Sequence, residues 1–95
     1  MMVKIDDELW VNPQQVQCIE YGNVWLDECT KFKIKDITPL LPYLTQVGEQ
    51  RWVNLSLVKW VEGMSWGYVD VFFSESDSLT VESGWLCGSR YFQRR

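Results

Sequence analysis

One sequence motif occurs twice in this chain. The segment WVNPQQVQCIE at residues 10–20 matches the segment WVNLSLVKWVE at residues 52–62, which lies 42 residues further on. Trp, Val, Asn, Val and Glu recur at equivalent positions, and Ile19 is matched by Val61. A repeat constrains the fold strongly, because both copies should form the same supersecondary unit. We therefore expect two similar units that share one core.

The predicted fold is mostly β, with a minor α component, in a single domain of residues 1–95. The two pseudo-repeats are expected to span about residues 2–47 and 48–92. Alternation of apolar and polar residues, interrupted by turn-forming residues, indicates short antiparallel strands in each. These strands are expected at residues 2–5, 9–11, 16–20, 24–26 and 31–35, and then at residues 51–53, 58–62, 68–73 and 79–81.

One short helix is predicted near residues 38–47. Thr38 and Pro39 suit the N-cap and the first helical position, and the leucines that follow supply an apolar face. Pro42 lacks an N–H, so the helix could instead begin just before that residue. The equivalent segment of the second unit, residues 84–88, begins and ends with glycine and has room for one turn at most.

The composition limits the kinds of partner. The formal net charge is −4 and the sequence pI is about 4.6, which argues against an affinity that comes mainly from phosphate contacts. Six tryptophans cannot all be buried in so small a core, so some should face solvent or a partner. Trp10 and Trp52 are interpreted as core or rim anchors. No apolar stretch approaches the roughly 18 residues of a membrane span, so we expect a cytoplasmic protein without a membrane partner.

No group of residues predicts an enzyme. Histidine is absent, and the serines have no neighbouring base in the sequence. The carboxylates fall in predicted turns, where Asp is favoured for backbone reasons. The cysteines at positions 18, 29 and 87 are too widely spaced for a zinc or redox motif, and we interpret them as reduced thiols. The sequence therefore predicts no catalytic residue, no metal ligand and no cofactor.

The order of apolar residues is similar to that of two known families. The first unit resembles small flagellar-regulator proteins through Val11-Asn12, Val16, Ile19-Glu20, Val24 to Leu26, Phe32-Lys33-Ile34 and Leu40 to Leu44. The whole chain resembles the LytTR-type DNA-binding domain of bacterial response regulators through Val53-Asn54-Leu55, Val58 and Val61. This resemblance implies an antiparallel β fold with one short helix, and DNA binding. The basic segments of the LytTR family fall on residues 48–50 and near residues 82–83, which are not basic here, so only Asn54 matches a functional residue.

Two classes of function follow. The first is a small non-enzymatic regulator or inhibitor that binds a protein, of the kind encoded by phages or mobile elements. Its predicted contacts are aromatic residues and a methionine: Met64, Trp66, Tyr68, Tyr91 and Phe92. The alternative is a divergent LytTR-like transcriptional regulator that binds DNA. Its predicted contacts are basic: Lys31, Lys33, Lys35, Arg90, Arg94 and Arg95.

Simpler interpretations of the same residues stay open. The lysines could form a solvated strand surface, Trp66 could fold over the open end of the sheet, and the C-terminal residues could be a frayed tail. Convergence of the lysines and arginines on one face would favour DNA, whereas an apolar patch around Trp66 would favour a protein. Exposed strand edges would also allow a homodimer.

Overall fold

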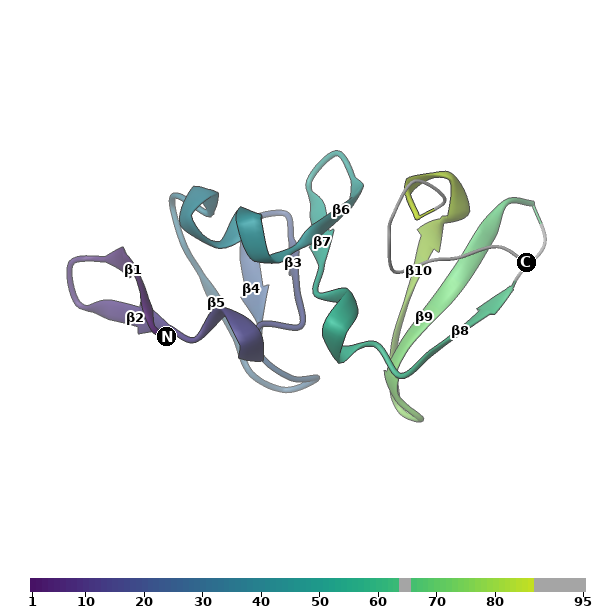
Figure 1. Ribbon diagram of the computed structural model, residues 1–95, viewed down its shortest axis with the longest axis horizontal. Coiled ribbons are helices and arrows are strands. Elements are labelled where there is room, and N and C mark those ends of the chain that lie inside the picture. Colours follow the sequence, from purple (N-terminus) through teal and green to yellow (C-terminus); the bar gives the residue numbers. More distant parts are fainter. Residues whose placement is uncertain (64–65, 87–95) are drawn as a thin grey trace.

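The computed structural model describes residues 1–63 and 66–86, which form three antiparallel sheets (Figure 1). Unit 1 contains β1 (Val3–Asp6), β2 (Leu9–Val11), η1 (Pro13–Gln15), β3 (Cys18–Glu20), β4 (Asn23–Trp25), β5 (Lys31–Lys33) and η2 (Thr38–Tyr43). Unit 2 repeats this order with β6 (Thr45–Gly48), β7 (Arg51–Val53), η3 (Leu55–Leu57), β8 (Trp60–Gly63), β9 (Tyr68–Ser74), β10 (Asp77–Glu82) and η4 (Ser83–Trp85). The prediction of a mostly β fold with two pseudo-repeated antiparallel units is confirmed.

The register of strand pairing repeats as well as the order of elements. Val11 of β2 lies opposite Val3 of β1, and 42 residues later Val53 of β7 lies opposite Thr45 of β6. Both hairpins have a register irregularity at the equivalent place in their first strand. The offset found in the sequence is therefore a structural repeat.

The repeated asparagine begins a short 3-10 helix in each unit. The side-chain oxygen of Asn12 accepts a hydrogen bond from the Gln14 N–H at 3.1 Å, and that of Asn54 accepts one from the Ser56 N–H at 3.2 Å. Asn is favoured at this position because its side chain satisfies an N–H that a helix start leaves free. The motif thus encodes a strand, a capped turn and a second strand.

The predicted helix differs from the structure in its type and in its end. It is the 3-10 helix η2, which stops at Tyr43, and Thr45–Gly48 form β6 instead. Pro42 lacks the N–H that an α-helix starting at Thr38 needs for its ladder of hydrogen bonds, so a regular α-helix cannot run through this segment. Unit 2 therefore begins at Thr45, a few residues before the predicted boundary.

Strand β7 connects the two units within one sheet. The five-stranded sheet has the order β5-β4-β3-β7-β6, so the β6–β7 hairpin of unit 2 extends the three-stranded meander of unit 1. Ile19 of β3 lies opposite Trp52 of β7, and Glu20 lies opposite Arg51. Arg51 Nε is 2.9 Å from Glu20 Oε2, which adds an ion pair to this junction.

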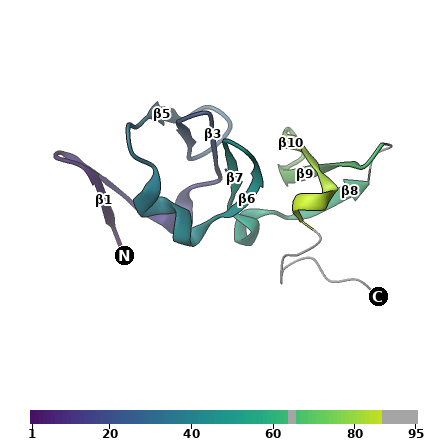
Figure 2. The same cartoon turned by 90° about the horizontal axis from the view of Figure 1, so that it is seen from above.

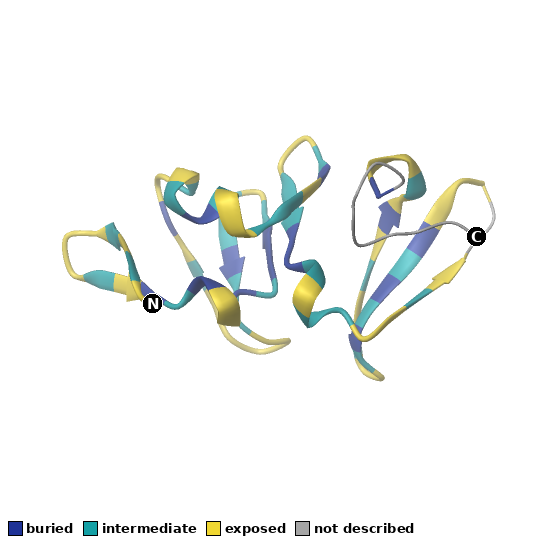
Figure 3. Ribbon diagram, viewed as in Figure 1, coloured by how far each residue is buried: buried dark blue, intermediate teal, exposed yellow. Residues whose placement is uncertain are grey.

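Each face of the five-stranded sheet packs against a separate core. On one face, Ile19 and Val24 pack with residues of the β1–β2 hairpin and of η2. On the other face, Cys18 and Val53 pack with Val71 and its neighbours in the three-stranded sheet β10-β9-β8. Buried residues lie between these layers (Figure 3). Two views at right angles show β1–β2 at one end of the molecule and β8–β10 at the other (Figures 1 and 2).

The two tryptophans of the repeated motif have different surroundings. Trp52 packs against the core of unit 1, as expected for an anchor. Trp10 is 55% exposed, so the prediction that it is an anchor fails at this position. Among the described residues, no helix has the length and apolarity that crossing a membrane requires.

Candidate nucleic-acid interface and exposed aromatic turns

Two of the predicted lysines share one face of β5, the outer strand of the five-stranded sheet. Lys31 and Lys33 are exposed, and Phe32 between them packs against the core, as the alternation predicts. Lys35 lies two residues beyond the end of β5 and is also exposed. The Lys31 ammonium lies 4.9 Å from the centroid of the Trp25 ring, a cation–π distance. This edge therefore presents three lysines within five residues.

The other predicted cationic contacts, Arg90, Arg94 and Arg95, lie outside the described residues, and their convergence with the lysines stays a prediction. The described part of the chain holds six of the nine basic residues and all thirteen acidic ones. Arg51 is paired with Glu20. Positive charge on the described surface is thus concentrated at the β5 edge.

The predicted aromatic contacts centre on the turn between β8 and β9. Trp66 is 92% exposed and Tyr68 is 42% exposed, so Trp66 does not fold over the end of the sheet. Trp66 has φ = +67°, and Gly67, which follows it, has φ = +78°. A bulky residue rarely adopts this left-handed conformation, which costs roughly 1–2 kcal/mol. Met64, Tyr91 and Phe92, the other predicted contacts, lie outside the described residues.

The β3–β4 turn of unit 1 has the same left-handed conformation, which the sequence analysis did not predict. Tyr21 has φ = +52° and Gly22 has φ = +85°. Tyr21 is 68% exposed and lines a groove of about 410 Å³ together with Trp85 of η4. The signal was present as an aromatic–glycine pair at the corresponding turn of each unit, Tyr21-Gly22 and Trp66-Gly67.

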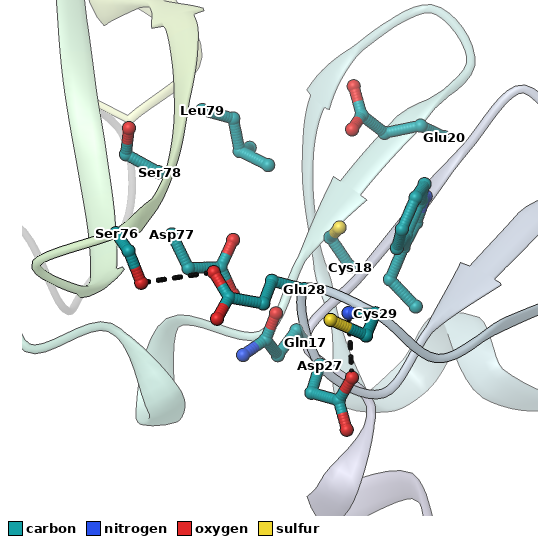
Figure 4. A pocket seen from close by; sticks show the side chains of 11 residues that line it. Gln17, Cys18, Glu20, Asp27, Glu28, Cys29, Ser76, Asp77, Ser78 and Leu79 are labelled. Atoms are coloured by element: carbon teal, nitrogen blue, oxygen red, sulfur yellow. Dashed lines mark hydrogen bonds between the residues drawn. The ribbon is translucent and has the colours of Figure 1, made fainter.

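A second groove of about 470 Å³ lies between the five-stranded sheet and the β9–β10 turn (Figure 4). Its lining includes the carboxylates of Glu20, Asp27, Glu28 and Asp77. Ser76 Oγ donates a hydrogen bond to Glu28 Oε2 at 3.0 Å and links the two sides. No three His, Cys, Asp or Glu side chains in the described ranges are grouped so as to hold a metal ion.

Two groups in this groove have shifted pKa values. Burial, with smaller effects from the nearby carboxylates of Glu20 and Asp77, raises the pKa of the Cys18 thiol to about 12. Cys18 therefore stays a neutral thiol near pH 7 and is a poor nucleophile. The backbone N–H groups of Cys29 and Thr30 donate to Asp27 Oδ1 and lower the pKa of that carboxyl below its usual value. Asp27 thus organises the turn, as its predicted place in a turn implies.

The one residue that the LytTR resemblance matched, Asn54, is only 4% exposed. Its amide nitrogen makes long hydrogen bonds to the carbonyls of Pro13 (3.5 Å) and Gln14 (3.4 Å) in unit 1. Its side-chain oxygen is occupied by the N–H and hydroxyl of Ser56. Asn54 therefore holds the two units together in this structure, and its side chain is not available to a ligand.

Comparison with known proteins identifies the fold. No protein-family model matches the sequence, and no curated protein matches it. A solved structure that is similar is the LytTr DNA-binding domain of a methyl-accepting/DNA response regulator from Bacillus cereus, with a TM-score of 0.65. The match has 14% sequence identity and covers 90% of this chain and 88% of that chain. The chain has a LytTR-type fold. The structural part of the predicted resemblance is confirmed.

Proposed function

We propose that the protein is a regulator that binds duplex DNA through the lysines of β5. The carrying observation is the LytTR-type fold, because the similar structure is named as a DNA-binding domain. The fold favours the DNA-binding alternative over the protein-binding hypothesis. Fold alone does not give function, so the proposal also rests on the exposed cationic edge.

Lys31, Lys33 and Lys35 supply the positive charge in the described part of this interface. Alternate residues of a strand are about 6.6 Å apart on one face, so Lys31 and Lys33 can contact separate phosphates. Each contact releases condensed counterions from DNA, which favours binding at low salt. Arg90, Arg94 and Arg95 would add contacts of the same kind. The thirteen acidic residues of the chain, among them Asp36 directly after Lys35, repel DNA and oppose this contact.

Salt titration of duplex binding tests the proposal. Fluorescence anisotropy of a labelled duplex of about 20 base pairs is measured between roughly 20 and 200 mM salt. The chain in which Lys31, Lys33 and Lys35 are changed to Gln should bind more weakly. The slope of log K against log salt should become shallower by about 2.7, because each phosphate contact contributes about 0.9.

A matched variant separates this edge from general charge. Lys4→Gln with Lys59→Gln removes two exposed lysines that lie outside the β5 edge and should leave the slope unchanged. The proposal is wrong if the unaltered chain does not bind duplex DNA at the lowest salt. It is also wrong if both variants lower the slope equally per lysine removed.

One observation favours a second candidate, a regulator or inhibitor that binds a protein. Trp66 combines 92% exposure with a left-handed backbone, and exposed tryptophans are frequent energetic centres of protein interfaces. If this candidate holds, Trp66→Ser should abolish capture of a partner from host lysate. Tyr21→Ser, at the equivalent turn of unit 1, is the matched control and should leave that capture intact.

A further inference from the structure

Among the residues that the structure describes, the internal repeat leaves one strand edge at each end without a pairing strand. In unit 1 the edge of β3 is paired with β7, the second strand of the hairpin that begins unit 2. The equivalent edge of β8 has no pairing strand among the residues that the structure describes. The equivalent of β7 is β2, and within the described ranges it pairs only with β1. The free edge of β8 is therefore equivalent to the β3 side of the β3–β7 junction, and the free edge of β2 is equivalent to its β7 side.

The two unused edges lie at opposite ends of the long axis. Figures 1 and 2 both show the β1–β2 hairpin at one end and β8 at the other. A strand edge exposes unpaired N–H and C=O groups and is a template for pairing with another chain. Since the edges differ and face apart, a contact between them would join successive molecules head to tail.

We propose that β2 of one molecule pairs with β8 of a second copy, in the register that β7 and β3 use within one chain. That register places Ile19 opposite Trp52 and Glu20 opposite Arg51. Moving both strands by the 42-residue repeat places Val61 of one copy opposite Trp10 of the other. The two residue types of the internal pair, a β-branched aliphatic and a tryptophan, are both kept.

The hydrogen bonds beside the internal junction have counterparts in the proposed one. The Asn54 N–H donates to the Gln17 carbonyl at 2.8 Å, next to the β3–β7 pairing. The equivalent donor and acceptor across the proposed contact are the Asn12 N–H and the Lys59 carbonyl. The amide side chain of Asn54 also reaches η1, and Asn12 would reach η3 of the neighbouring copy in the same way.

Exposure fits an interface at these positions. Trp10 is 55% exposed and Trp60 is 37% exposed, whereas Ile19, at the paired edge, is fully buried. The proposed junction lacks the ion pair of the internal one, because Leu9 stands at the position equivalent to Arg51 and cannot pair with Glu62. We therefore expect a weak association, with a dissociation constant of about 10 µM to 1 mM, as for other small interfaces.

Sedimentation of the full chain at increasing concentration, with two blocking variants, tests this register. The Asn54 N–H donates to the Gln17 carbonyl and the Tyr21 N–H donates to the Gln50 carbonyl, so Ile19–Trp52, which lies between them, is also a hydrogen-bonded pair of the ladder. By the repeat, the N–H groups of Val61 and Trp10 point outward. Trp10→Pro and Val61→Pro each remove one outward N–H, and proline is tolerated on edge strands. Each variant alone should stay at 11.3 kDa where the unaltered chain associates.

An equimolar mixture of the two variants gives the sharpest result. One intact β2 edge and one intact β8 edge remain, so the mixture should form a dimer and nothing larger. A mixture that stays monomeric overturns the proposal, as does association of either variant alone. An unaltered chain that is monomeric at about 1 mM also overturns it.

A third variant keeps the proposal testable if a proline disturbs folding. Leu9→Arg restores the position equivalent to Arg51 and should tighten association roughly two- to fivefold by pairing with Glu62. Adding Glu62→Gln should cancel that gain. If Leu9→Arg does not tighten association, or if its gain persists with Gln at position 62, the register is wrong. None of these variants alters the β5 lysines, so loss of assembly and loss of DNA binding are separable.

Discussion

Unit 1 and unit 2 contain the same elements in the same order, yet within the described ranges only β3 of unit 1, and not its counterpart β8, has a strand paired on its outer edge. β3 pairs with β7, whereas β8 lies at an edge of the described structure. Ile19 is consequently fully buried, and Val61, its repeat partner, is only partly buried. The two residues have similar side chains and the same local structure. Their burial therefore differs because of what packs around them, which for Ile19 includes Trp52 of β7 and Leu40 of η2.

The turns between the first two meander strands differ as well. Tyr21-Gly22 connects β3 and β4 directly, whereas the β8–β9 connection contains four residues, 64–67. Both turns hold an aromatic residue in a left-handed conformation. The longer turn raises the exposure of its aromatic residue from 68% for Tyr21 to 92% for Trp66. The aromatic side chain is therefore more accessible at the turn of unit 2.

The alkylation rates of Cys18 and Cys29 test whether the two units stay packed together. Cys18 lies in the core between the five-stranded and three-stranded sheets, and Cys29 is exposed. With a pKa of about 12, Cys18 is about 0.01% thiolate at pH 8. In a Cys87→Ser background, we expect alkylation of Cys18 to be at least about 1,000-fold slower than that of Cys29. Similar rates, measured by mass spectrometry, would mean that the sheets separate readily.

The second prediction compares the repeat partners Ile19 and Val61. Ile19→Ala should lower the free energy of unfolding by about 2–4 kcal/mol, because it leaves a cavity in a fully buried site. Val61→Ala should cost about 0.5–1 kcal/mol in dilute solution, where β8 has no second copy beside it. Urea denaturation measures both, and a single transition is expected because the units share a sheet. Equal losses would contradict the difference between the two edges.

The repeated order of elements could be predicted from the sequence, whereas the pairing between the two units could not. Alternation of apolar and polar residues predicted most of the strands, and the repeated motif predicted the two units, because both depend on local residue spacing. β6 was mistaken for the end of a helix, because Thr45–Gly48 carries no strand signal apart from its partner β7. The β3–β7 pairing and the burial of Asn54 depend on residues far apart in the chain. Local pattern could not supply them.

The functional residues divide in the same way. Exposure of Lys31 and Lys33 followed from strand alternation, whereas turn composition left open whether Trp66 is exposed or folds over the sheet. The left-handed conformation of Tyr21 and Trp66 was not predicted, because it depends on the geometry that a tight turn imposes on its central residues. The loss of Asn54 as a contact residue was missed because a resemblance transfers residue identity without burial.

The third prediction compares Asn54 with its repeat partner Asn12. Asn54→Ala should cost about 2 kcal/mol, since it removes a cap and the bonds that reach Pro13 and Gln14. Asn12→Ala should cost about 1 kcal/mol, because only the cap is lost. Thermal or urea unfolding of the two variants measures the difference. An equal cost would show that the contact of Asn54 with unit 1 adds no stability.

The smallest expected effect is at the turns. Tyr21→Gly and Trp66→Gly should each stabilise the protein by about 0.5–1 kcal/mol, because glycine adopts a positive φ without steric cost. The gain is partly offset by the greater freedom of glycine in the unfolded chain. Gly22→Ala and Gly67→Ala are the matched opposite changes and should destabilise. A loss on replacing either aromatic residue would mean that its side chain makes stabilising contacts.

Amide hydrogen exchange at Ile19 and Val61 distinguishes the paired edge of unit 1 from the open edge of unit 2. Both amides occupy the same place in the repeat, and the register directs each toward the position that β7 fills in unit 1. In dilute solution we expect the Ile19 amide to exchange slowly, near the limit set by global unfolding, and the Val61 amide to exchange quickly. Protection of Val61 should rise with protein concentration as β2 of a second copy pairs with β8. Slow exchange at both amides in dilute solution would contradict an open edge on unit 2.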